Sequence, residues 1–296
     1  MPSGQGSITA GELERVLLFV GVDNILSPDE WLRKLKNNSL SSQDLCLTFD
    51  DGLKSQYDIG LPVLEKYGLK AFWFVFTSVF EGGVAKYEVY NRFAAQYFSG
   101  MDDFYRDFFT RCGESIMGQL TKERFLHYAR TTQAMCPFYS MGDLKYRFIR
   151  NELLSQGEFE DVMDGMIEEE GLTIEAIAKN LWLSDTELKA LSLKGHTIGL
   201  HSYDHPFQIA RLPVREQARQ YERNDQHIKK VCGQEVLSMS HPLNSYSEDT
   251  LKILKSMGVV CGFRSNIMPP PGKKVNPDPL EWAREDAANI LKVLGS

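Results

Sequence analysis

Uninterrupted apolar runs alternate with helical periodicity in the first part of the chain. The runs at 16–22 (VLLFVGV), 45–49 (LCLTF) and 71–76 (AFWFVF) have the length of strands. Apolar strands without alternation are typical of parallel sheets that are buried on both faces. A helical pattern begins at Ser27, with a proline in its first turn, and another ends at Gly68. The pattern predicts strand–helix units of an α/β fold.

The same alternation returns in the last third of the chain. We expect strands at 196–200, 235–240 and 259–263, helices at 184–194, 213–231, 247–257 and 285–294, and a proline-rich loop at 268–279. The segment 80–182 differs, because it contains amphipathic helical stretches rich in aromatic residues and no convincing strand. It is too long for one crossover connection. We therefore predict a catalytic domain formed by 1–79 and 183–296, with a helical insertion at 80–182 that is a candidate lid or substrate-selecting element.

Composition and charge argue against several classes of protein, including nucleic-acid-binding, disulfide-rich and membrane-spanning ones. The 296 residues carry a net charge of -7 without a concentrated basic run, which argues against nucleic acid as the partner. The five cysteines are scattered and lack CxxC spacing, so they indicate neither a disulfide framework nor a thiolate zinc site. The first residues show no basic segment followed by an apolar one, and 18 apolar residues never run together. We expect a cytoplasmic protein that does not span a membrane; its oligomeric state is unknown.

Polar residues with catalytic or metal-binding chemistry follow three of the predicted strands. Asp50 and Asp51 follow the strand at 45–49, His201 and His205 follow the strand at 196–200, and His241 ends a later strand. The carboxyl ends of parallel strands meet at one edge, where ligands bind. Two histidines and one carboxylate suit zinc or another divalent first-row metal and leave positions open for water and substrate. Taken singly, Asp-Asp-Gly also fits a simple turn, and an HxxxH pair outside a helix also fits a structural role.

These residues lie in motifs that resemble one family. Thr48-Phe49-Asp50-Asp51-Gly52 matches the T-F-D-D-G motif of the polysaccharide deacetylases, which share a NodB-type domain and are also called carbohydrate esterase family 4. The stretch 195–206, GHTIGLHSYDHP, matches the family's second motif almost position for position. The resemblance covers about half of the chain. It implies a distorted (β/α) barrel, often with seven parallel strands.

The resemblance also implies roles for individual residues. Asp50 corresponds to the general base, while Asp51, His201 and His205 correspond to the metal ligands. We expect the metal to be zinc, with cobalt, nickel, iron and manganese as alternatives. Ser202 corresponds to a residue that stabilises the histidine loop.

Two later family motifs are altered. Where the family has R-x-P, this chain has Ser240-His241-Pro242, so the arginine that orients the catalytic aspartate is missing. We predict that Arg284 replaces it from the C-terminal segment. The family's last motif supplies a histidine as general acid, and no histidine follows His241. We predict that His241 donates the proton; otherwise Asp286, the insertion or the substrate must supply it. We assign Pro242 and Tyr246 to substrate binding.

The leading hypothesis is a metal-dependent deacetylase that removes an N-acetyl group from an amino sugar in bacterial surface-polysaccharide biosynthesis, for O-antigen or capsule. The expected substrate is an acetylated amino sugar that is nucleotide-linked, lipid-linked or part of an oligosaccharide. One alternative is a deformylase of a formamido sugar. Another is a non-catalytic protein of the same fold that contains the metal and binds carbohydrate.

Overall fold

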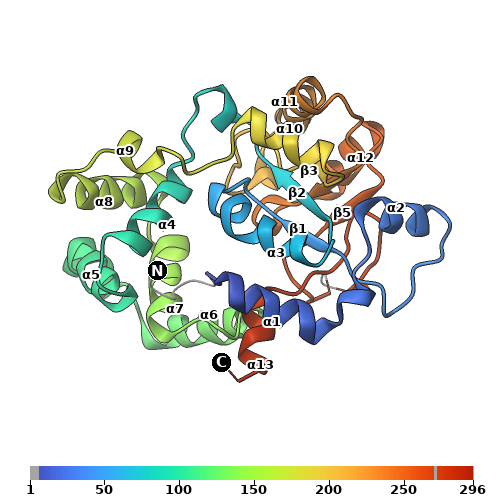
Figure 1. Cartoon of the computed structure of the whole chain (residues 1–296). Coiled ribbons are helices and arrows are strands. Elements are labelled where there is room, and N and C mark those ends of the chain that lie inside the picture. Colours follow the sequence, from blue (N-terminus) through green and yellow to red (C-terminus); the bar gives the residue numbers. More distant parts are fainter. Residues whose placement is uncertain (1–6, 270–271, 296) are drawn as a thin grey trace. The chain divides into compact units, whose positions relative to one another are not determined.

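The chain folds into two compact units. The structure, a computed structural model, describes residues 7–269 and 272–295. The first unit, which we call the sheet unit, comprises Thr9–Gly83 and Asn180–Asp286 (Figure 1). The second, the helical unit, comprises Val84–Lys179 and residues near both chain ends. Residues 1–6 of the predicted catalytic domain, and 270–271 of the predicted proline-rich loop, lie outside the described residues.

The sheet unit contains a five-stranded parallel sheet, which confirms the α/β prediction. The strands lie in the order β1-β2-β3-β4-β5, and each pairs in parallel with the next. Their bounds are Leu47–Phe49 for β1, Ala71–Val75 for β2, Thr197–Leu200 for β3, Ser238–Ser240 for β4 and Cys261–Phe263 for β5. The prediction of about seven strands was wrong for the described residues. Beyond β1 and β5 the pairing continues only as the single parallel bridges Ile25–Leu45 and Phe263–Trp282 in the described residues.

The apolar run at 16–22 forms a helix and not the predicted strand. α1 spans Ala10–Val20, and Thr9 and Glu12 form a capping box at its start. Leu13, Val16 and Leu17 are buried on one face of this helix, whereas Leu18 and Phe19 are 57% and 56% exposed. The run therefore follows helical periodicity, because its apolar residues divide between a buried and an exposed face.

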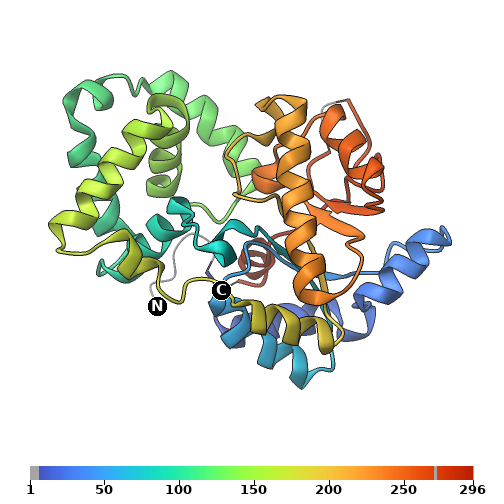
Figure 2. The ribbon, with the colours of Figure 1, turned by 90° about the horizontal axis from the view of Figure 1, so that it is seen from above.

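Helices cover the sheet between successive strands, as the alternation predicted. Their bounds are Pro28–Lys36 for α2, Leu61–Lys66 for α3, Asp185–Leu193 for α10, Val214–Cys232 for α11 and Glu248–Ser256 for α12. Ser27, Ser184 and Ser247 cap α2, α10 and α12, respectively, by accepting hydrogen bonds from backbone amides in the first turn. α11 packs against α10, α12 and β3 (Figure 2). Because all the strands are parallel, their carboxyl ends share one edge of the sheet.

The second strand of the sheet, β2, anchors the core of the sheet unit, and all five of its residues are buried. Phe72 and Phe74 pack on one face with Phe263, their ring centroids lying 5.4 and 5.5 Å from that of Phe263. Trp73 points to the other face and stacks on Phe49 at 4.5 Å. Each fully buried aromatic side chain contributes roughly 1.5–3 kcal/mol to folding. This packing holds the strands on which the site is built.

His196, just before β3, has a structural role that yields a pH prediction. It is 2% exposed, and its Nδ1 accepts hydrogen bonds from the Ala71 amide (3.1 Å) and from Trp73 Nε1 (3.2 Å). Burial lowers the pKa of His196 to about 4. Because the unfolded chain binds this proton near pH 6.5, stability is complete above pH 6.5 and is lost as the pH falls towards 4.

We expect wild type to lose about 2 kcal/mol more of its free energy of unfolding than His196→Gln does between pH 7 and pH 5. Urea unfolding of both proteins at the two pH values measures the difference. Equal pH slopes would contradict this assignment.

The helical unit consists of helices packed around aromatic side chains. It contains α4 (Lys86–Gln96), α5 (Met101–Gly118), α6 (Lys122–Met135), α7 (Met141–Phe148), α8 (Gln156–Glu169), α9 (Ile174–Ala178) and α13 (Ala287–Val293). Its described residues form no strand. Phe93, Phe104, Phe108 and Phe159 are at most 3% exposed, so these aromatic residues form a core. The lid role and the boundaries at 80 and 182 stay predictions. Across the described residues, no helix is both long and apolar enough to cross a bilayer.

Candidate metal and catalytic site

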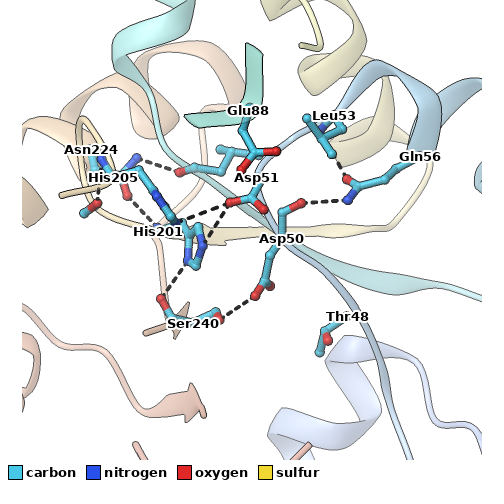
Figure 3. A network of polar contacts seen from close by, with 12 residues as sticks. Thr48, Asp50, Asp51, Leu53, Gln56, Glu88, His201, His205, Asn224 and Ser240 are labelled. Carbon is cyan, nitrogen blue, oxygen red and sulfur yellow. Dashed lines mark hydrogen bonds and ion pairs between the residues drawn. The ribbon is translucent and has the colours of Figure 1, made fainter. Parts of the chain in front are cut away.

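The first part of the site is the turn that follows β1. Asp51 and Gly52 adopt left-handed backbone conformations, with φ of 72° and 61°. Gln56 holds the turn, because its amide nitrogen donates to the carbonyl of Asp50 (2.7 Å) and its amide oxygen accepts from the amide of Leu53 (3.2 Å). Figure 3 shows that the side chains of Asp50 and Asp51 leave this turn in different directions. The two adjacent carboxylates thus have different partners.

The second part is the loop after β3, which carries both histidines. Ser202 and His205 also have positive φ, at 65° and 55°. Such conformations cost non-glycine residues roughly 1–3 kcal/mol and cluster at functional sites. The Ser202 hydroxyl accepts from the amide of His205 (3.2 Å), which agrees with a stabilising role for this serine. The strained loop turns both imidazoles towards Asp51 (Figure 3).

Asp51, His201 and His205 meet in a cluster with the donor set of a metal site. One ligand atom from each lies within 4.8 Å of the others. Oδ1 of Asp51 is 3.3 Å from His201 Nε2 and 3.4 Å from His205 Nε2. This oxygen is buried and makes no hydrogen bond within the described structure. A buried carboxylate oxygen without a hydrogen bond, facing two imidazole nitrogens, fits a divalent cation.

The orientation of His201 and the protonation state of His205 suit metal binding. Its Nδ1 lies 2.9 Å from the carbonyl oxygen of Ser240, to which a protonated Nδ1 donates. That contact leaves Nε2 facing Asp51, an arrangement common for metal-binding histidines. Burial acts to lower the pKa of His201, but Asp50 and Asp51 outweigh it and raise the pKa, so a metal would displace the Nε2 proton. Burial lowers the pKa of His205 to about 4, so this imidazole is neutral near pH 7 and available as a ligand.

Asp50 lies beside this cluster and is held by an arginine. Arg284 donates from Nη1 to Oδ1 (2.8 Å) and from Nη2 to Oδ2 (2.6 Å) of Asp50. The hydroxyl of Ser240 also donates to Oδ2 (3.0 Å). Burial acts to raise the pKa of Asp50, but the charges of Arg284 and His201 outweigh it and hold the pKa well below its usual range. Asp50 is therefore a carboxylate fixed by Arg284, and the replacement of the missing family arginine by Arg284 stays a prediction.

The geometry does not favour His241 as the general acid. His241 is 1% exposed, and its Nε2 lies 2.8 Å from the carbonyl oxygen of Leu280, to which a protonated Nε2 donates. Burial lowers the pKa of His241 to about 3, so the ring is neutral near pH 7. A neutral ring whose proton is engaged by a backbone carbonyl does not readily deliver that proton to a leaving amine. The prediction failed to foresee this partner, which lies 39 residues along the chain.

The two residues assigned to substrate binding lie next to His241. Pro242 is buried, and Tyr246 stacks on the His241 ring with a centroid distance of 4.1 Å. The hydroxyl of Tyr246 donates to the buried carboxylate of Glu281 (2.8 Å). These contacts are structural, and a role in substrate binding stays a prediction.

Sequence reasoning missed residues on α11 that position the histidine loop. Asn224 accepts from the amide of His201 (2.8 Å) and donates to the carbonyl of Val75 (2.8 Å), which links β2 to β3 (Figure 3). Gln220 accepts from the amides of Tyr203 and Asp204, each at 3.1 Å. A signal was present, because polar residues spaced three and four apart occupy the buried face of α11.

Metal binding to this cluster should stabilise the fold. A ligand that binds only the folded state adds about 3 kcal/mol when its free concentration is roughly 100 times Kd. We expect zinc to raise Tm of the wild-type protein, and we expect His205→Ala to abolish the increase. His127→Ala, on a helix of the helical unit, is the matched control and should keep it. Differential scanning fluorimetry with and without chelator makes the comparison, and an undiminished zinc response in His205→Ala would contradict the site.

Solved structures of deacetylases resemble the whole chain. IcaB from Ammonifex degensii aligns with a TM-score of 0.54 and 16% identity over 99% of this chain and 91% of that one. The Streptococcus pyogenes deacetylase PplD aligns with 0.52 and 16% over 97% and 88%. The BpsB deacetylase domain from Bordetella bronchiseptica aligns with 0.53 and 13% over 96% and 86%. At these low identities, the TM-scores show a shared fold. A comparison with curated proteins finds no match.

The sequence profile of the polysaccharide deacetylase family matches residues 37–96 and 162–262, which together make up more than half of the chain. The first range contains Asp50 and Asp51, and the second contains both histidines of the cluster. The chain belongs to the polysaccharide deacetylase family.

Proposed function

We propose that this protein is a metal-dependent hydrolase that removes the N-acetyl group of an amino sugar in the biosynthesis of a bacterial surface polysaccharide, such as O-antigen or capsule. The observation that carries the proposal is the pairing of two carboxylates with separate partners. Asp51 faces His201 and His205, while Asp50 is bound by Arg284 and Ser240. Family membership supports the reaction class. PplD, one of the structures with this fold, was solved in complex with acetate.

The three residues of the cluster would hold the metal, which we propose to be zinc. When bound there, it supplies Lewis acidity that polarises an amide carbonyl and lowers the pKa of water to about 7. Asp50 accepts the proton of the attacking water through a carboxylate oxygen. Its two oxygens are fixed by the guanidinium fork of Arg284, so the base does not rotate away from the water. Proton acceptance of this kind contributes roughly 10²–10⁴ to the rate.

The general acid, which would protonate the departing amine, is the role in this reaction that has no assigned residue. His241 is engaged by the Leu280 carbonyl, so the proton must come from water, the substrate or another side chain. This observation favours one other function, a protein that keeps the metal and binds an acetylated glycan without turnover. Metal and glycan binding with no acetate release would identify that function.

The test is acetate release from a panel of acetamido sugars by the purified zinc-loaded protein. The panel includes a nucleotide-linked sugar, a lipid-linked sugar and a chitin-type oligosaccharide. We expect at least one substrate to yield acetate, with the deacetylated product identified by mass, and we expect chelator to abolish the reaction. Release of formate from a formamido analogue, with none of acetate, would replace deacetylation by deformylation. Failure with every substrate, or turnover unaffected by chelator, would overturn the proposal.

A further inference from the structure

The helical unit contains two arginines that lie close together in sequence, at the junction of two consecutive helical segments. Arg147 lies in the last turn of α7, and Arg150 lies three residues later in the π-helical turn Ile149–Leu153. Residues three apart on a helix share a face. Arg150 donates from Nη1 to the hydroxyl of Tyr87 (2.7 Å) and from Nε to the side chain of Asn151 (2.8 Å). We call Arg147 and Arg150 the arginine pair.

No carboxylate in the described chain forms an ion pair with either arginine. Nε of Arg147 is buried and has no hydrogen-bond partner there. Asp143, one turn earlier, is already occupied, since its Oδ1 accepts from Tyr105 and its Oδ2 accepts from the Ser140 amide and hydroxyl. Burial acts to lower the pKa of Arg147, but Tyr87, Tyr139, Tyr146 and Asp143 outweigh it and raise the pKa. Asp143 carries one negative charge against the two positive charges of the arginine pair.

Aromatic rings surround the arginine pair and leave it partly open. The guanidinium of Arg147 lies 4.0 Å from the ring centroid of Tyr139, and that of Arg150 lies 5.0 Å from the ring centroid of Tyr87. All four side chains belong to residues of intermediate exposure, so part of each residue faces solvent. Burial acts to raise the pKa of Tyr87, but Arg150 and Arg147 outweigh it and lower the pKa. The two arginines therefore favour negative charge at the Tyr87 hydroxyl.

The backbone at the pair is also irregular. The helix changes from α to π geometry at Ile149, immediately between the two arginines. Single π turns within helices are rare and occur frequently at functional sites. This geometry is independent of the charges and marks the same residues.

We infer that Arg147 and Arg150, together with the hydroxyl of Tyr87, bind a phosphate or diphosphate group. Arginine forks match the oxygens of phosphate and carboxylate. The choice between these anions follows from charge, because two guanidinium groups without an ion-paired carboxylate match a doubly charged oxyanion better than a single carboxylate. The inference goes beyond the proposed function and does not depend on it, since the pair would bind phosphate whether or not the chain hydrolyses an amide.

Calorimetric titration of the full chain with inorganic pyrophosphate tests the inference. Excess chelator in the buffer removes any contribution from metal at the Asp51 cluster. We expect saturable binding to one site, and we expect the double variant R147Q/R150Q to weaken it at least tenfold. The matched control K122Q/K145Q removes two positive charges from the same helical unit and should change the affinity less than threefold. Equal weakening in the control would show general electrostatic attraction and would overturn the site.

Two further measurements test the role of the guanidinium forks and the choice of phosphate over carboxylate. R147K/R150K retains both charges but lacks the guanidinium forks, so its affinity should fall between wild type and R147Q/R150Q; this variant also serves if the glutamine variant does not fold by circular dichroism. Glucuronate, a singly charged carboxylate, should bind at least tenfold more weakly than pyrophosphate. Equal affinity for both anions would overturn the phosphate assignment, and wild-type affinity in both double variants would overturn the role of the pair.

Discussion

Replacing Asp50 with Asn is expected to lower kcat/KM for the acetylated substrate by about 10²–10⁴ while the protein keeps its metal. Asn has the size and shape of Asp but cannot accept the proton of water. The metal should remain, because its proposed ligands are Asp51, His201 and His205, and Asp50 contacts Arg284 and Ser240 instead. Acetate release gives the rate, and elemental analysis of the purified variant gives the metal content.

Asp58→Asn is the matched control for this prediction. Asp58 is paired with Lys54 (2.6 Å), and its side chain is 54% exposed. The variant makes the same chemical change at the surface, so its rate should stay within about twofold of wild type. Loss of metal from Asp50→Asn would instead make Asp50 a ligand. An unchanged rate with metal present would show that another group takes the proton.

Replacing Arg284 with Gln is expected to lower the free energy of unfolding by about 3 kcal/mol and to reduce the rate as well. Only 15% of the Arg284 side chain and 24% of the Asp50 side chain are exposed. Removing the arginine leaves a largely buried carboxylate without its counter-charge, which is the costly way to break such a pair. Urea unfolding measures the stability. Arg284→Lys keeps the charge without the two-pronged contact and should recover part of the loss.

Arg219→Gln provides the control for Arg284. Arg219 also binds a carboxylate at 2.6 Å, that of Glu216, but its side chain is 48% exposed. Surface pairs of this kind contribute about 0–1 kcal/mol, so the control should lose little stability. In a double-mutant cycle, Arg284→Gln should cost less in the Asp50→Asn background than in wild type. Equal costs in the two backgrounds would show that Arg284 acts through its other partners, Thr48, Ser240 and the Arg264 carbonyl.

The sequence was sufficient to predict the parallel α/β sheet and to find the residues that form the cluster. The reason is local, because Asp50, Asp51, His201 and His205 each follow directly after a strand or its first turn. The carboxyl ends of parallel strands meet at one edge whatever their order. The Arg284 contact was also anticipated, since a missing motif arginine leaves a carboxylate that needs a partner.

Other features depend on information that short patterns do not contain. The run at 16–22 is apolar throughout, and only its capping residues, Thr9 and Glu12, distinguish a helix from a strand. The engagement of His241 depends on the path of a distant loop that brings the Leu280 carbonyl to it. The contribution of Asn224 depends on which face of α11 packs against the sheet. Tertiary packing decides each of these features.

The contacts of Asp50 and its turn have a consequence for the order of events during synthesis. The backbone after Asp51 is held by the segment that follows Lys179, because the Leu183 amide donates to the Gly52 carbonyl and the Lys54 amide donates to the Leu181 carbonyl, each at 2.9 Å. Arg284 is 234 residues further along the chain than Asp50. In a nascent chain Asp50 therefore lacks its arginine until nearly all of the chain has been made, whereas the histidines that face Asp51 come about 80 residues earlier. A ribosome-stalled fragment lacking Arg284 carries Asp50 without its counter-charge.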